Sequence, residues 1–151
     1  MGRLGDFFPK HKKQEYIDRQ LKPGQVLYLQ CEFINPQKDK YLVLACPGTR
    51  PLLFIINSKI PPFIEKHPDL HKCQVKLCAS DYSFLDHDSF VDCAKVIDYF
   101  DESEIRQQVL DDVGRIKGEL NTATRKAIIK AVHNAKSITP RHKRLIVDSL
   151  K

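Results

Sequence analysis

The chain has 151 residues, of which 42% are hydrophobic, and its 25 Lys and Arg exceed its 19 Asp and Glu by six. This length and hydrophobic content predict one domain with a real core. No run of 18 apolar residues occurs, which excludes a membrane-spanning helix. The N-terminal stretch lacks the continuous apolar segment of a signal peptide, so we expect a cytoplasmic protein with reduced cysteines.

Charge is unevenly distributed along the chain. Residues 1–80 hold thirteen Lys or Arg and seven Asp or Glu, residues 81–112 hold two and ten, and residues 113–151 hold ten and two. A basic segment can bind phosphate backbones by releasing their counterions. It can equally be a solvated helix face, or it can neutralise the acidic segment. Charge alone leaves these alternatives open.

The first hundred residues predict an arm followed by five short strands. Residues 1–22 are polar and basic, with enough apolar positions for a short helix or a docked segment, and a Pro-Gly turn follows. The strands alternate in polarity or are wholly apolar, and Pro, Gly or polar residues separate them: 25–33, 41–46, 52–57, 74–79 and 89–100. Short strands with no long helix between them predict a small antiparallel, barrel-like sheet.

After residue 100 the apolar spacing becomes helical. A first helix is expected from Ser103 to about Ile116, a second over 121–136, and a third over 139–150 with Thr139 as its N-cap. The fold class predicted from these elements is α+β, a small antiparallel sheet followed by C-terminal helices.

Residues 81–93 read DYSFLDHDSFVDC and admit three interpretations. A metal site would use Asp86, His87, Asp88 and Asp92, but neighbouring residues of an extended chain point to opposite faces, so we expect no metal there. A catalytic site would use His87 as a general base oriented by a carboxylate. A structural loop before a strand makes the fewest demands, and it predicts a hydrogen bond between the backbone and the side chain of Asp88 or Ser89.

Several segments in order resemble a known family. They are GQVLYLQCEF, KYLVLA after a polar loop, a strand ending in IINS, QVKL, and DSFVDCAKVIDY before a helix. Residues 24 to about 120 resemble the MazF/PemK toxins of the CcdB/PemK superfamily. The resemblance implies an SH3-like barrel over 23–120, an N-terminal arm over 1–22, and a basic helical extension over 121–151.

The resemblance also implies a function. Family members are toxins of toxin–antitoxin systems that cut single-stranded RNA without a metal, so it implies a homodimer, a cognate antitoxin protein and no cofactor. The family's catalytic Arg, in an Arg-Pro pair, corresponds here to Lys40, which lacks the planar fork of Arg. Its Ser or Thr corresponds to Ser58. Arg50 is a possible substitute cation, and His87 or Ser58 a candidate for proton transfer.

A second hypothesis is that the chain has the same fold but does not cleave RNA. Lys40 in place of Arg favours a non-catalytic module that binds RNA or a protein, and the CcdB branch of the superfamily acts on a protein target. The candidate RNA-binding residues, which fit both hypotheses, are Lys38, Arg125, Lys126 and Lys130. Cys73 and Cys78 stand four residues apart, which is not a usual zinc spacing, so no metal is expected there either.

Overall fold

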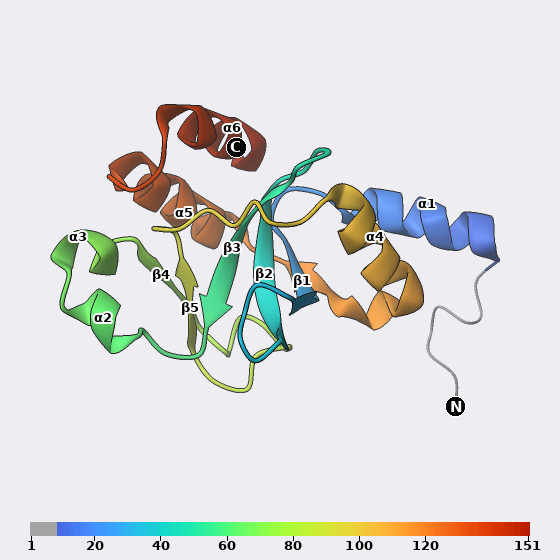
Figure 1. Ribbon diagram of the computed structural model, residues 1–151, viewed down its shortest axis with the longest axis horizontal. Helices are drawn as coiled ribbons and strands as arrows, with labels where there is room; N and C mark the ends of the chain where they lie inside the picture. The colour runs from blue at the N-terminus through green and yellow to red at the C-terminus, as the bar shows by residue number, and fades with distance from the viewer. Residues whose placement is uncertain (1–8) are drawn as a thin grey trace.

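Six antiparallel strands form one curled sheet in the computed structural model, which describes residues 9–151 (Figure 1). The spatial order is β4-β5-β3-β2-β1-β6. The strands are β1 (Gln25–Cys31), β2 (Lys38–Cys46), β3 (Leu52–Asn57), β4 (Gln74–Leu77), β5 (Ser89–Asp92) and β6 (Ile116–Glu119). The predicted α+β class with an antiparallel sheet and C-terminal helices is confirmed.

The three central strands form a meander whose pleat separates two sets of side chains. Gly24, at φ 87°, turns the chain into β1, where the Pro-Gly turn was predicted. Tyr28 pairs with Tyr41 of β2, and Leu29 pairs with Lys40. Because successive side chains of a strand point to opposite faces, the tyrosines lie on one face of the sheet and the Leu29 side chain on the other.

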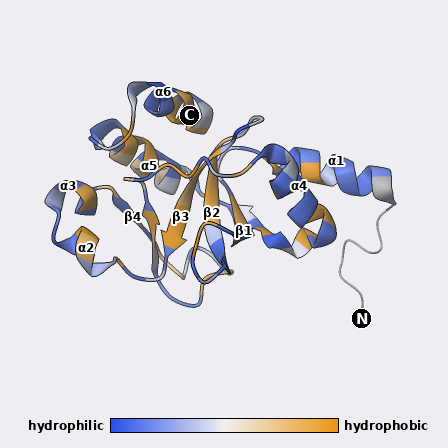
Figure 2. Ribbon diagram, viewed as in Figure 1, coloured by the Kyte–Doolittle hydropathy of each residue, from blue (hydrophilic) through white to orange (hydrophobic). Residues whose placement is uncertain are grey.

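Helices cover both faces of this sheet. On the face of Leu29, α1 (Lys10–Gln20) and α4 (Glu102–Asp111) contribute apolar side chains such as Ile17 and Ile105 to one buried cluster. On the other face, α5 (Thr122–Asn134) and α6 (Pro140–Leu150) pack over a second cluster. Figure 2 shows hydrophobic residues concentrated in the central strands between the helices, while the helices carry both hydrophilic and hydrophobic residues. Among residues 9–151, no helix has the length and hydropathy needed to cross a bilayer.

The C-terminal helices are part of the core rather than an addition to it. Ile128, Val132, Ile146 and Leu150 are at most 1% exposed and belong to the same cluster as Phe54 of β3. The predicted N-terminal arm is docked from residue 10 onward through α1, and its residues 1–8 lie outside the described part of the chain.

Short elements connect the strands at the sheet's edges. The proline-rich stretch forms two single-turn helices, α2 (Pro62–Glu65) and α3 (Pro68–His71), each with a proline in its first turn, where a missing N–H costs nothing. A 3₁₀ turn, η2 (Val113–Arg115), joins α4 to β6.

The chain after residue 89 departs from the predicted elements in two places. β5 ends at Asp92 rather than near residue 100, and Ile97 makes a single bridge to β3 instead. α4 ends at Asp111, because Asp112 is extended and its carboxylate accepts the N–H of Gly114. Residues 116–119 then form β6, which pairs with β1. The bridge of Ile97 to β3 and the pairing of β6 with β1 join segments distant in sequence, which apolar spacing does not reveal.

Candidate functional site

A hollow of about 210 Å³ opens at the end of the β2–β3 ladder opposite to its turn. The loop that precedes β5 forms its other wall. Aromatic and polar side chains share the lining: Tyr28, Asp39, Lys40, Tyr41, Ile56, Ser58, Phe84, Leu85, Asp86, His87 and Ser89. Of the four candidate catalytic residues, the hollow brings together Lys40, Ser58 and His87.

A row of aromatic rings lines this hollow. The ring centroids of Tyr28 and Tyr41 lie 4.6 Å apart, and those of Tyr41 and Phe84 lie 5.4 Å apart. The row continues to Tyr82, whose ring centroid lies 5.9 Å from that of Phe84. The Tyr82 hydroxyl contacts the Thr124 hydroxyl at 2.7 Å. The Tyr41 hydroxyl donates to the carbonyl of Phe84 at 3.3 Å. Burial raises the pKa of Tyr41, and the neighbouring Tyr28 and Asp86 add to this shift.

Hydrogen bonds between the backbone and the side chains of Asp88 and Ser89 hold the loop before β5, as the sequence predicted. The Asp88 carboxylate accepts the N–H of Ala79 at 2.8 Å, and this bond is the main cause that lowers the pKa of Asp88. The Ser89 hydroxyl donates to the His87 carbonyl at 3.1 Å. The predicted hydrogen bond between the backbone and the side chain of Asp88 or Ser89 is therefore confirmed, and the catalytic interpretation of His87 stays a prediction. The loop also places His87 in the wall of the hollow with Ser58, although both side chains are exposed.

Lys40 borders the hollow, but its ammonium group lies elsewhere. Successive side chains of β2 point to opposite faces of the sheet, so the Lys40 side chain lies on the face opposite that of Tyr41. Its Nζ donates to Oδ1 of Asn57 at 3.4 Å. Burial, and secondarily the charge of Lys38, lower the pKa of Lys40. Lys40 therefore does not aim its charge at His87 and Ser58.

Arg50 is not part of this site. It lies in the turn that joins β2 to β3, at the other end of the ladder from Lys40 and Asn57. Its guanidinium pairs with Asp101 at 3.1 Å, and both side chains are more than half exposed. The suggested substitution of Lys40 by Arg50 is thus not supported by their positions.

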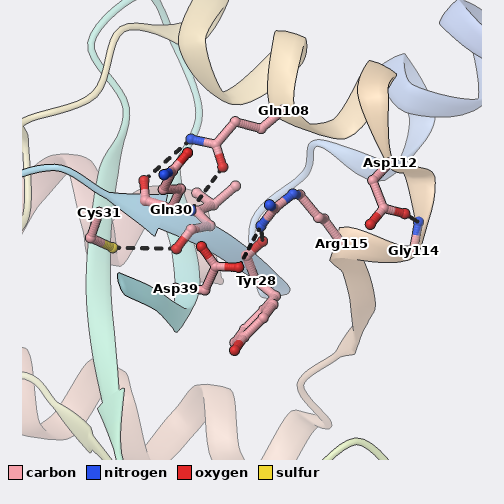
Figure 3. Close-up of polar contacts among 9 residues, drawn as sticks. Tyr28, Gln30, Cys31, Asp39, Gln108, Asp112, Gly114 and Arg115 are labelled. Atoms are coloured by element: carbon pink, nitrogen blue, oxygen red, sulfur yellow. Dashed lines mark hydrogen bonds and ion pairs between the residues drawn. The ribbon is translucent and has the colours of Figure 1, made fainter. Parts of the chain in front are cut away.

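Two cations that the sequence did not single out, Arg115 and Lys117, lie beside Tyr28 of β1, and Figure 3 shows Arg115. Nη1 of Arg115 donates to the carbonyl of Tyr28 at 2.7 Å and lies 3.4 Å from the Asp39 carboxylate. Nζ of Lys117 lies 5.7 Å from the centroid of the Tyr28 ring. Both belong to the segment predicted as helix end and linker, so only the unexpected strand β6 reveals their position. Tyr28 itself carried a signal, being an aromatic residue on the polar face of a predicted strand.

The candidate RNA-binding residues divide into two groups. Arg125 is structural, because its guanidinium donates to the carbonyls of Leu150 and Lys151 and so caps the end of α6. Lys126 and Lys130 are exposed on the outer face of α5, and Lys38 is exposed at the start of β2. In the described part of the chain, no ion pair within 4.0 Å involves any of these three lysines.

Nothing in the donor set points to a metal centre. Within residues 9–151, no three or more His, Cys, Asp or Glu side chains gather as ligands would. All five cysteines are free, with Cys31, Cys73 and Cys93 buried and the other two partly buried.

No protein-family model matches this chain, and no curated protein shows significant similarity to it. These comparisons therefore lend no support to the MazF/PemK resemblance, and any functional argument depends on the geometry of the hollow.

Proposed function

We propose that the hollow binds single-stranded RNA. The observation that carries the proposal is the row formed by Tyr28, Tyr41 and Phe84 in the wall of a polar hollow. Stacking of bases on aromatic side chains, combined with nearby cations that follow the phosphate backbone, is the usual way in which proteins hold single strands. Lys117, beside the Tyr28 ring, supplies such a cation.

The test compares two aromatic substitutions. Binding of a labelled, unstructured RNA oligonucleotide is measured by fluorescence anisotropy for the wild type, Tyr41→Ala and Tyr99→Ala. Tyr99 is a matched control, because it is 46% exposed and packs edge-to-face against Phe33, and neither residue lines the hollow. Loss of one stacked base costs about 1–3 kcal/mol, so Tyr41→Ala is expected to bind about tenfold more weakly and Tyr99→Ala almost as the wild type does. Equal binding by all three proteins would overturn the proposal.

Cleavage of the bound RNA is the second candidate, favoured by the presence of His87 and Ser58 in the same hollow. His87 would take the proton of a ribose 2′-hydroxyl, whose oxygen attacks the adjacent phosphorus. The bond to the 5′-oxygen breaks, that oxygen receives a proton, and a 2′,3′-cyclic phosphate remains. Lys117, whose Nζ lies 5.7 Å from the centroid of the Tyr28 ring, is a candidate cation for the developing phosphorane charge.

Cleavage has its own experiment. RNA is incubated with the protein in EDTA, and the products are analysed for cyclic phosphate ends. His87→Ala should lower the rate at least about a hundredfold, as loss of a general base does, while His133→Ala on the exposed face of α5 should leave it unchanged. If RNA is bound but no cyclic phosphate forms, the protein is a binding module.

The most specific form of the proposal is that the protein is a toxin that acts on RNA. The curled antiparallel sheet and the position of Ser58 after β3 are compatible with the SH3-like barrel of the MazF/PemK family. On that basis we propose a cytoplasmic homodimer held inactive by an antitoxin protein. Induced expression should then arrest growth, the His87→Ala variant should not, and light scattering should give twice the mass of the chain. Unimpaired growth on expression of the wild type would remove the toxin role and leave RNA binding intact.

A further inference from the structure

Arg115 connects the edge of β1 to the hollow. Its Nη1 atom reaches both the Tyr28 carbonyl and, at 3.4 Å, the carboxylate of Asp39 (Figure 3). The side chains of Arg115 and Asp39 are 21% and 32% exposed, so water screens this pair less than it screens Arg50–Asp101. Tyr28 and Asp39 both line the hollow, whereas Arg115 does not. Arg115 therefore contacts two residues that line the hollow without lining it itself.

The local backbone fixes Arg115 in this position. The Asp112 carboxylate accepts the N–H of Gly114 at 3.0 Å, and the Arg115 N–H donates to the Asp112 carbonyl at 3.1 Å. Next to it, the side-chain amide of Gln108 accepts the N–H of Gln30 at 2.8 Å and donates to its carbonyl at 3.3 Å. The exposed edge of β1 is thus held by side chains from α4 and η2, and the guanidinium is positioned before any ligand arrives.

The charge balance of the hollow makes this contact important. Asp39 and Asp86 both line it. An unpaired carboxylate close to a bound phosphate repels it, and that repulsion grows as the site is removed from water. An arginine in contact with the carboxylate offsets its charge, and the planar guanidinium can serve Asp39 and the Tyr28 carbonyl together.

We infer that Arg115 is a positioning residue that lets the hollow accept an RNA phosphate by neutralising Asp39. This inference rests on the proposed RNA binding and adds a residue that acts through Asp39 without touching the RNA. It predicts energetic coupling, because the contribution of Arg115 to affinity depends on the presence of the Asp39 carboxylate.

A double-mutant cycle tests this coupling. RNA affinity is measured for the wild type, Arg115→Gln, Asp39→Asn and the double variant, at two salt concentrations. Arg115→Gln should weaken binding about tenfold at low salt, and less at high salt where charges are screened. In the Asp39→Asn background the same substitution should cost less than about twofold, since no carboxylate remains to be neutralised.

A control separates charge from support of the strand edge. Gln108→Ala removes the two hydrogen bonds to Gln30 without changing any charge, and it should leave RNA affinity unchanged. Thermal unfolding of each variant identifies losses that come from unfolding. Equal losses on Arg115→Gln in both backgrounds, or none in either, would overturn the inference. If Tyr41→Ala also binds as the wild type does, RNA binding at the hollow fails first, whereas a Tyr41 effect without coupling overturns the role of Arg115 alone.

Discussion

The two faces of the sheet differ in how far helices cover them. On the α1–α4 face, Leu29 and Leu42 are completely buried close to the open end of the strands. On the α5–α6 face, Val26 and Val43 are buried, but Tyr28 and Tyr41, one pleat further on, are only partly buried and border the hollow. The same two strands therefore stabilise the fold through one face and offer a binding surface on the other.

A binding surface can lie on this sheet at little cost to stability where the helices stop covering it. The hollow begins where the helix cover ends, and its wall is made of aromatic rings that are both apolar and able to stack on a ligand. Removing the cover, or exchanging residues between the two faces, should separate stability from binding.

The largest effect is expected from removing α5 and α6. Truncation after Leu120 deletes Ile128, Val132, Ile146 and Leu150, all buried against the sheet. At about 1.5–3 kcal/mol for each buried side chain, the loss is comparable to the total stability of a typical domain. The truncated chain should show no cooperative unfolding transition by circular dichroism. A transition close to that of the full chain would mean that 121–151 is an independent extension.

Neighbouring residues of β1 give the next largest effect and separate the two faces. Leu29→Ala empties a fully buried site and should lower the free energy of unfolding by about 2–5 kcal/mol, while the folded fraction retains its RNA affinity. Tyr28→Ala, on the hollow side, should be less destabilising and should weaken RNA binding about tenfold. Chemical denaturation and anisotropy on the same samples measure both quantities. Parallel losses in both variants would show that the faces do not divide these roles.

A smaller, pH-dependent effect on stability is expected from Cys31, which is buried on the α1–α4 face. Burial, opposed by the charge of Lys40 and reinforced by that of Asp39, raises the pKa of Cys31 from 9.0 to about 11. The thiol therefore contributes stability below pH 9, where it is protonated in both states. That contribution is lost as the pH rises from about 9 to about 11, because the unfolded chain releases the proton first.

Denaturation at pH 8 and pH 11 checks this expectation. The wild type should lose about 1–2 kcal/mol more than Cys31→Ala over this interval. Leu29→Ala, which removes buried atoms without removing a titrating group, should follow the wild type. An identical pH dependence in the wild type and Cys31→Ala would contradict the assignment to Cys31.

Much of the fold could be predicted from the sequence because local patterns determine it. The alternation in residues 25–33, the turn at Gly24 and the N-cap at Thr139 each depend on a few neighbouring residues. β6 escaped prediction because IKGE is a strand only through its pairing with β1, 89 or more residues earlier in the chain. The helix was predicted to run past Asp111 because the local contact that ends it, between the Asp112 carboxylate and the N–H of Gly114, was not recognised.

The candidate site was only partly predictable. His87 was identified by residue type and Ser58 through the family resemblance, and both line one hollow. The side-chain direction of Lys40 depends on which face of β2 points to that hollow, and the role of Arg115 depends on β6. Arg125 carried the right charge for RNA, but its guanidinium caps α6. The type of a residue indicates which chemistry its side chain can perform, but the direction in which the side chain points depends on how the strands pair.

The smallest effect is expected from the outer face of α5, away from both sides of the comparison. Lys126 and Lys130 are one turn apart and exposed, so they can contact phosphates of an RNA longer than the hollow holds. Each lost contact lowers the slope of log affinity against log salt by about 0.7 for single strands, so Lys126→Ala/Lys130→Ala should lower it by about 1.4. Because neither lysine is in an ion pair within the described residues, stability should be unchanged. A short oligonucleotide of about four nucleotides is the control, since it should bind both proteins equally. An unchanged slope with long RNA would show that this basic face is only a solvated surface, and that binding is confined to the hollow.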